Sequence, residues 1–246
     1  MDATGHTALI TGGASGIGLA LAAAFAKHGN KVIAVGRNAD KLAEAKARLP
    51  GLDTLVCDLR DEQQLERLAI VLRDQYPALN VLVNNAGVQY NYAFLDARVD
   101  EVGDTIAEEI RLNLTAPIQL TARLLPHLAA QRQAAIINVT SGVGIVPKQS
   151  APVYCATKAG LRLYTAALRH QLAATNIRVF ELIPPLVDTA MTEGRGSGKM
   201  SPKEVADRFW AAFARDRLEV PVGKIRLLKL LHRAAPRFAE NLLKNS

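Results

Sequence analysis

The sequence predicts an α/β fold in which one parallel sheet of about seven strands is covered by helices on both faces. Two observations carry this prediction. Short apolar runs alternate with longer helical patterns, and a glycine-rich turn follows the first apolar run. Strands separated by helices form βαβ units, which give a parallel sheet with right-handed crossovers. We therefore expect a doubly wound sheet that binds its ligands beyond the carboxyl ends of the strands.

The elements follow one another in a regular order, without an internal repeat or a low-complexity linker. The expected strands are Thr7–Ile10, Lys31–Val35, Thr54–Cys57, Val81–Asn84, Ala135–Val139 and Arg178–Ile183. The expected helices are Gly16–His28, Asp40–Leu49, Asp61–Gln75, Ala107–Ala130 and Tyr154–Thr175. Residues 1–246 are thus expected to form a single domain.

Composition excludes several other classes of protein. No apolar run approaches the roughly 18–20 residues that a membrane span requires. The first residues lack the basic and apolar regions of a signal peptide, which favours a cytoplasmic location. The two cysteines, Cys57 and Cys155, lie far apart and do not indicate a disulfide framework. No metal site is predicted.

The first strand leads into a turn with the spacing GxxxGxG, followed by an alanine-rich helix. Glycines permit a tight turn and close approach of the backbone, and the helix start offers free N–H groups and a positive dipole end. This arrangement predicts a dinucleotide pyrophosphate site. Its expected contacts are Gly12, Ser15, Gly16, Ile17 and Gly18.

The end of the second strand indicates which dinucleotide is bound. Sites that prefer NAD usually carry an acidic residue there, which binds the ribose hydroxyls and repels a 2′-phosphate. Here the strand ends in Gly36, Arg37 and Asn38, so the acid is missing. A guanidinium suits a phosphate, and Arg37 therefore favours NADP(H) over NAD(H).

A second group of residues predicts the chemistry. Tyr154 and Lys158 are four positions apart on a predicted helix, which places them on one face about 5–6 Å apart. An ammonium so close is expected to lower the pKa of the phenol, so that Tyr154 exchanges protons near neutral pH. Ser141 follows a predicted strand, and we expect its hydroxyl to meet the phenol over a shared carbonyl oxygen. Such a site reduces ketones or oxidises alcohols when a hydride source lies alongside.

Together, these motifs resemble the short-chain dehydrogenase/reductase family from about Gly5 to Thr189. The resemblance implies a single-domain Rossmann fold, a Ser-Tyr-Lys-Asn mechanism and a homodimer or homotetramer. By this resemblance, Asn113 is the fourth catalytic residue, and Lys158 lowers the tyrosine's pKa and binds the nicotinamide ribose. A closer resemblance, to bacterial short-chain oxidoreductases encoded near genes for D-alanylation of teichoic acids, rests on Pro147–Gln149, Pro184-Pro185 and Val222–Lys224.

The resemblance also assigns further cofactor contacts. Asp58 and Leu59 are expected to hold the adenine, and Asn85, Ala86 and Gly87 to line the adenosine side, whereas Asn84 mainly stabilises the sheet. Tyr154 and Lys158 are cofactor contacts as well, and Pro184 and Thr189 are expected to lie over the nicotinamide carboxamide. The family usually has Pro-Gly where this chain has Pro184-Pro185, so we expect a stiffer loop with one fewer backbone donor.

The motifs favour an NADP(H)-dependent oxidoreductase that moves hydride between nicotinamide and a carbonyl or secondary alcohol. Two alternatives stay open: a non-catalytic NADP-binding sensor or scaffold of the same fold, and an enzyme like 3-oxoacyl-acyl-carrier-protein reductase. Three segments are expected to wall the substrate pocket: Gln89–Tyr92, Val143–Gln149 and Met191–Met200. The last belongs to an expected substrate loop or lid spanning 190–222, and Lys148 is a candidate for attracting an anionic group.

The C-terminal segment, residues 223–246, is basic and amphipathic, with six Lys or Arg residues against one acid, Glu240. It is expected to pack on its own protein or a dimer mate. The alternative, a basic helix on an anionic membrane surface, is less favoured but stays open. Nucleic acid is not an expected partner, because the excess charge is local and no recognition motif accompanies it.

Overall fold

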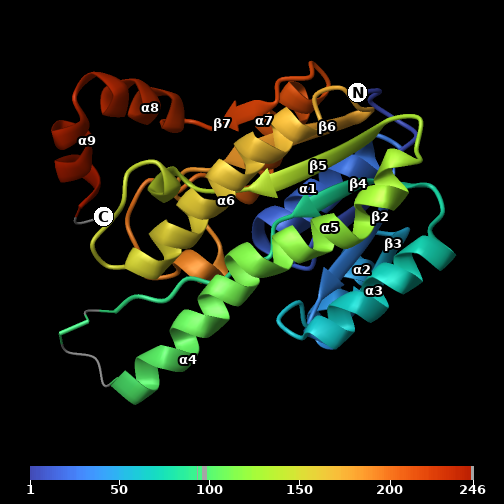
Figure 1. Ribbon diagram of the computed structural model, residues 1–246, viewed down its shortest axis with the longest axis horizontal. Coiled ribbons are helices and arrows are strands. Elements are labelled where there is room, and N and C mark those ends of the chain that lie inside the picture. Colours follow the sequence, from blue (N-terminus) through green and yellow to red (C-terminus); the bar gives the residue numbers. More distant parts are fainter. Residues whose placement is uncertain (93, 96–98, 245–246) are drawn as a thin grey trace.

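The protein folds around one sheet of parallel strands flanked by helices (Figure 1). The computed structural model describes residues 1–92, 94–95 and 99–244. Within these residues, seven strands lie in the order β3-β2-β1-β4-β5-β6-β7. Their bounds are β1 Thr7–Thr11, β2 Lys31–Gly36, β3 Leu52–Val56, β4 Leu79–Asn84, β5 Ala134–Val139, β6 Ile177–Ile183 and β7 Glu219–Pro221.

The order of the strands reverses at β1, where one crossover leads outward to β2 and a later one brings β4 to its other side. The doubly wound topology predicted from the sequence is therefore confirmed. In such a sheet, the reversal point opens a crevice at the carboxyl ends of the strands. The glycine turn lies at this point, directly after β1.

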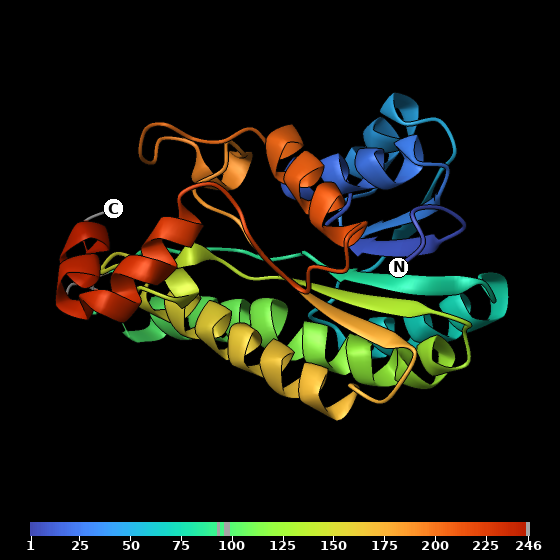
Figure 2. The ribbon, with the colours of Figure 1, turned by 90° about the horizontal axis from the view of Figure 1, so that it is seen from above.

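Helices cover the two faces of the sheet, as Figure 2 shows from above. On one face, α1 (Gly16–Lys27), α2 (Ala39–Arg48) and α7 (Pro202–Phe213) share a core that includes Phe25, Phe209 and Phe213. On the other, α3 (Glu62–Gln75), α5 (Ala116–Ala129) and α6 (Pro152–Gln171) pack through leucines of each helix. β1, β4 and β5 are buried along their whole length because both faces are covered.

The six strands expected from the sequence all form, each with ends within two residues of the predicted ones. The expected helix Ala107–Ala130 differs. It is instead α4 (Val99–Ile110), a π-helical turn (Arg111–Thr115) and then α5. A π turn holds one extra residue, which changes the direction of the side chains that follow it. Asn113 lies in the middle of this turn and is fully buried.

The segment 190–222 contains regular elements as well as a loop. α7 begins at Pro202 with a capping box between Ser201 and Glu204, and its Phe209 and Phe213 are fully buried. Burying one such side chain contributes about 1.5–3 kcal/mol, so α7 is part of the core. β7 closes this segment, and its three residues are too few to give a strand pattern in the sequence. The longest stretch of this segment without a helix or strand is 193–201, which follows a 3-10 turn (Ala190–Thr192).

The C-terminal segment forms two short helices, α8 (Ile225–Ala234) and α9 (Pro236–Leu243), beyond the end of the sheet (Figure 1). Ile225 and Leu228 are buried in a small cluster with Val146, Ile183 and Ala239. One face of the segment thus packs on its own protein, as expected. Its last two residues, 245–246, lie outside the described residues. Other apolar side chains remain exposed, namely Leu227, Leu230, Phe238 and Leu242.

Candidate active site

The glycine turn is shaped by contacts that exclude any side chain. Gly12 and Gly16 have φ angles of 64° and 53°, a region that favours glycine. A β-carbon on Gly18 would lie 2.2 Å from the carbonyl oxygen of Gly12 and 2.6 Å from Nδ2 of Asn85. The sequence of the turn therefore follows from its packing, as close approach of helix and strand requires.

The start of α1 is open to an anion. In α2 and α3, the N-cap side chains Asn38 and Asp61 accept hydrogen bonds from the first backbone N–H groups. Ser15 at the N-cap of α1 makes no such bond, and the first turn contains no acidic residue. Its free N–H groups and positive dipole end are available to a phosphate. Ser15 is exposed and Ile17 half-buried.

Thr11 and Asn85 tie the turn to the end of β4. The Thr11 hydroxyl accepts hydrogen bonds from the backbone N–H groups of Asn85 (2.9 Å) and Ala86 (3.1 Å). Nδ2 of Asn85 donates to the carbonyl oxygen of Thr11 at 2.9 Å. Asn84, by contrast, is buried beneath α5 and donates to Asn138 of β5 and Thr121 of α5. Asn85 thus stabilises the glycine turn, whereas Asn84 stabilises the sheet and its contact with α5.

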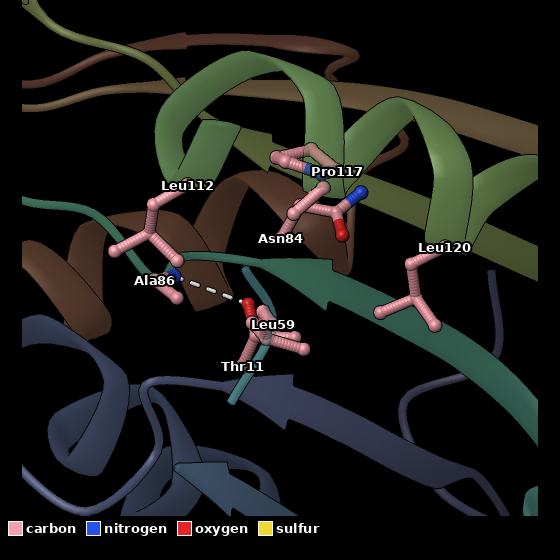
Figure 3. A pocket seen from close by; sticks show the side chains of 8 residues that line it. Thr11, Leu59, Asn84, Ala86, Leu112, Pro117 and Leu120 are labelled. Carbon is pink, nitrogen blue, oxygen red and sulfur yellow. Dashed lines mark hydrogen bonds between the residues drawn. The ribbon is translucent and has the colours of Figure 1, made fainter. Parts of the chain in front are cut away.

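Beside this junction lies a small pocket, which Figure 3 shows from close by. Leu59, expected to contact adenine, lines it together with Ala86 and Leu112. Asp58 is bound by its neighbour Arg60, whose Nε lies 2.9 Å from Oδ1, and this contact lowers the pKa of Asp58. Arg60 also pairs with Glu108.

Arg37 stands further out than the other expected cofactor residues. Its side chain is 57% exposed, and its Nη1 lies 3.6 Å from a carboxylate oxygen of Glu108. That distance describes a loose ion pair, since strong guanidinium–carboxylate hydrogen bonds are about 2.7–2.9 Å long. The guanidinium is therefore largely free to bind another anion.

Lys158, Asn113 and Gly87 meet at the end of β5. Lys158 is buried and its Nζ donates to the carbonyl oxygen of Val139 at 2.9 Å. Asn113 accepts from the backbone N–H of Val88 at 2.9 Å and donates to the Val88 carbonyl oxygen at 2.8 Å. A β-carbon on Gly87 would lie 2.9 Å from Oδ1 of Asn113 and 3.7 Å from Nζ of Lys158.

Tyr154 lies in the first turn of α6, where it faces Ser141 and Lys158. Nζ of Lys158 is 5.7 Å from the centre of the Tyr154 ring. A hydrogen bond with Ser141 acts to lower the pKa of the phenol. Ser141 comes directly before a 3-10 turn (Gly142–Gly144), and its hydroxyl also accepts from the Val143 N–H at 3.3 Å.

The electrostatics differ from the sequence expectation. Burial raises the pKa of Tyr154 well above its usual value, and the negative charge of Glu109 raises it further. Burial also lowers the pKa of Lys158 to about 8, although Glu109 opposes this shift. Because burial outweighs the attraction to Lys158 that the helix spacing suggested, Tyr154 is protonated at neutral pH.

Glu109 is the site residue that the sequence analysis missed. Its side chain is fully buried and accepts a hydrogen bond from the Tyr92 hydroxyl at 2.7 Å and from the Tyr90 N–H at 3.3 Å. Burial raises the pKa of its carboxyl group. The sequence did contain a signal for Glu109. It lies four residues before Asn113, and residues four apart on a helix lie on the same face.

The nicotinamide segment reaches the glycine turn. Pro184 is buried at the end of β6, and its carbonyl oxygen accepts from the Gly142 N–H at 3.3 Å. Thr189 caps a short 3-10 turn (Ala190–Thr192) and lies so near Gly16 that a β-carbon there would be 3.1 Å from Thr189 Cγ2. The structure thus brings Thr189 to the glycine turn and joins Ser141, Tyr154, Lys158 and Asn113, while Arg37 remains at the rim.

This geometry agrees with comparisons to known proteins. The chain belongs to the short-chain dehydrogenase family, whose model matches residues 6–199. It is thus an oxidoreductase that acts on CH–OH or C=O groups, and the resemblance predicted from the motifs is confirmed.

Relatives and solved structures support this classification. The chain is 47% identical over 193 residues to the uncharacterized oxidoreductase DltE of Bacillus subtilis, covering 78% of this chain and 76% of that protein. It is 36% identical to 3-oxoacyl-[acyl-carrier-protein] reductase FabG of Thermotoga maritima, with 78% of each covered. A short-chain dehydrogenase from Burkholderia cenocepacia, solved with NADP, matches all of both chains with a TM-score of 0.87 and 25% identity.

No helix within residues 1–92, 94–95 and 99–244 has the length and apolar character needed to cross a bilayer.

Proposed function

We propose that this protein is an NADP(H)-dependent oxidoreductase that transfers hydride between nicotinamide and a carbonyl or secondary alcohol. The observation that carries the proposal is the meeting of Tyr154, Ser141 and Lys158 at the carboxyl edge of the sheet. The glycine turn lies at the same edge, and Thr189 extends to it from the segment after β6. Proton-transfer groups and a dinucleotide cradle therefore border one crevice.

The cradle fits a dinucleotide, because the space beside Gly18 and Gly12 admits no side chain and the start of α1 has no cap. When bound, the cofactor supplies or accepts the hydride. Gly12, Ser15, Gly16, Ile17 and Gly18 would hold its pyrophosphate.

The other cofactor residues would hold the two ends of the molecule. Asp58, Leu59, Asn85, Ala86 and Gly87 would hold the adenosine, Lys158 the nicotinamide ribose, and Pro184 and Thr189 the carboxamide. Arg37 would bind the 2′-phosphate, since its guanidinium is exposed and only loosely paired. The NADP of the Burkholderia structure supports this choice over NAD.

In reduction, Tyr154 donates a proton to the carbonyl oxygen of the substrate while Ser141 holds that oxygen by a hydrogen bond. The raised pKa of Tyr154 keeps the phenol protonated at neutral pH, which suits this direction. Lys158 provides a positive charge near the phenolate that remains, and Asn113 links Lys158 to protons from solvent. In alcohol oxidation, the same groups act in reverse.

The proposal is tested by a panel of carbonyls and alcohols, with NADPH absorbance as the signal. We expect turnover of at least one substrate, and Tyr154→Phe should lower kcat by roughly a hundredfold or more. Tyr76→Phe removes a hydroxyl at the distant end of α3 and serves as the control. NADPH binding by Tyr154→Phe should persist. Near-normal turnover in that variant would refute the mechanism, and tight NADPH binding without any turnover would favour the sensor.

A second candidate lies within the same class. The 36% identity to a 3-oxoacyl-[acyl-carrier-protein] reductase favours a 3-oxoacyl thioester as the carbonyl substrate. Such thioesters belong in the panel, beside free ketones and aldehydes.

We further propose that the protein works in the cytoplasm as a homodimer or homotetramer. Membership of the family, whose oligomers usually pair the helices that correspond to α5 and α6, supports self-association. Light scattering on a sizing column would measure the mass, and a monomer at micromolar concentration would contradict this assembly.

Residues 190–201 are the proposed lid over substrate.

A further inference from the structure

The loop after Thr189 is closed at its base, so that its tip is held near the site. The N–H of Asp188 donates to the carbonyl oxygen of Met200 at 2.9 Å, and Nζ of Lys199 donates to the Thr192 carbonyl oxygen at 2.6 Å. The N–H of Arg195 donates to the same Thr192 oxygen at 3.0 Å. These bonds place Arg195 at a defined point of the loop.

The two cations of this loop differ in their partners. Lys199 has both the Thr192 oxygen and Asp188, at 3.8 Å. Nη1 of Arg195 is shielded from solvent and, among the described residues, makes no hydrogen bond. A buried donor without an acceptor is unfavourable, and more so when it is charged. One donor of the Arg195 guanidinium, Nη1, therefore lacks an acceptor that a ligand could supply.

Lys148 is a second cation, and it lies close enough to Arg195 for the two charges to interact. Its backbone N–H lies 3.4 Å from the sulfur of Cys155, the residue after Tyr154, which fixes Lys148 beside the start of α6. Its side chain is half-buried and forms no ion pair in the described part of the chain. Burial, and then the positive charge of Arg195, lower the pKa of Lys148. Two neighbouring cations without an acid repel each other until an anion joins them.

The charge of Arg195 also acts on the catalytic phenol, where it opposes the raised pKa of Tyr154. Glu109, the carboxylate whose charge acts on Tyr154 and Lys158, is already bonded to Tyr92 and Tyr90. It is not the missing partner. An anion bound to Arg195 would thus lie within electrostatic range of Tyr154, and it would not need to displace Glu109 from its hydrogen bonds.

We infer that Arg195 and Lys148 form a subsite for an anionic group of the substrate, a carboxylate or a phosphate ester on the molecule that carries the carbonyl. This inference rests on the proposed function and narrows its substrate to acidic carbonyl compounds. A planar guanidinium matches two oxygens of either group, and the lysine adds a point charge.

The test compares binding of matched ligand pairs to the full chain with saturating NADP⁺, by titration calorimetry. Each pair contains a hydroxy acid and its primary amide, or a phosphate ester and the free alcohol, over a range of chain lengths. We expect at least one acid or phosphate to bind roughly tenfold or more tightly than its neutral partner. The two kinds of pair decide between carboxylate and phosphate.

Variants then connect this preference to the two residues. Arg195→Gln and Lys148→Gln should each bring the affinity ratio toward one, while Arg195→Lys keeps part of it. Lys203→Gln, an exposed cation on α7, removes the same charge and should leave the ratio unchanged. Absence of any preference for an anion, or a preference unaffected by Arg195→Gln and Lys148→Gln, would overturn the inference.

The two proposals fail in different ways. Tyr154-dependent turnover of neutral ketones without a preference for anions would leave the oxidoreductase standing and remove the subsite. A preference for anions lost in Arg195→Gln, with no Tyr154-dependent turnover of any carbonyl, would keep the subsite and remove the proposed reaction.

Discussion

The cofactor side and the substrate side of the crevice are built differently. At the glycine turn, a β-carbon on Gly18 would lie 2.2 Å from backbone, and Asn85 and Thr11 lock the turn to β4. In the loop after Thr189, Gly194 and Gly198 have nothing within 4 Å of the corresponding position. One side is fixed by tertiary packing, and the other is held chiefly by hydrogen bonds within its own segment.

This difference indicates which side of the crevice tolerates substitutions. A cofactor is the same at every turnover, and a rigid cradle loses little entropy on binding it. A substrate must enter and leave, and open glycines permit the movement of a loop over it. Substitutions should therefore have large effects on the first side and small effects on the second.

The largest effect is expected for Gly18→Ala, which inserts a methyl group where the turn has no space. Overpacking of this kind typically costs about 1–3 kcal/mol, and contact with backbone puts this site at the upper end. Thermal unfolding should show Tm lowered by about 6–12 °C, together with a weaker affinity for NADPH. Gly103→Ala, on α4 with open space, is the matched control and should keep or slightly raise Tm. Equal effects of the two substitutions would contradict the rigid cradle.

The next effect is expected at the rim of the cofactor side. Arg37→Gln removes the charge proposed to bind the 2′-phosphate, and should raise KM for NADPH roughly 10- to 100-fold while KM for NADH stays the same. Arg48→Gln, an exposed arginine of α2, is the control. Steady-state kinetics with both cofactors measures the ratio. An unchanged ratio, or a wild-type preference for NADH, would remove Arg37 from the cofactor site.

A smaller effect is expected where the two sides meet, at Glu109. Its negative charge raises the pKa of Tyr154, so Glu109→Gln should lower that pKa. Alcohol oxidation requires the phenolate, so the rising limb of its pH profile should move to lower pH. Glu62→Gln, with an exposed carboxylate on α3, should leave the limb in place. A shift to higher pH in Glu109→Gln would mean that Glu109 acts in another way.

The smallest effect is expected in the substrate loop. Gly198 has a φ of 67° and open surroundings, so Gly198→Ala costs only the strain of a left-handed backbone, about 1–2 kcal/mol. Differential scanning calorimetry should show a Tm change of a few degrees at most, and NADPH affinity should not change. A loss of NADPH affinity as large as that of Gly18→Ala would erase the distinction between the two sides.

The cofactor side was the more predictable of the two. Strand, turn and helix are local in sequence, and the spacing Gly12, Gly16, Gly18 reports a close approach that only glycine allows. The shared position of Tyr154 and Lys158 was equally predictable, because residues four positions apart on a helix lie on one face. These signals led to the doubly wound sheet that the structure has.

The other features of the site could not be predicted, because they depend on burial and on contacts between distant segments. Neither leaves a local pattern in the sequence. Whether burial or the nearby ammonium dominates the pKa of Tyr154 is decided by neighbours such as Glu109, which comes from another helix. The proposed subsite of Arg195 and Lys148 combines residues from different loops. The π turn around Asn113 interrupts what reads as one continuous helix, since its residues retain a helical pattern.

The C-terminal helix α8 contacts the backbone next to Ser141. Ile225, at the start of α8, occupies the volume beside Gly142, where a β-carbon would lie 2.6 Å from its Cδ1. Ile225, which is 84 positions after Ser141 in the sequence, thus packs against the backbone that follows Ser141. A partner or surface that moved α8 away would remove this contact, so we expect α8 to help hold the Ser141 hydroxyl that is proposed to bind the substrate oxygen.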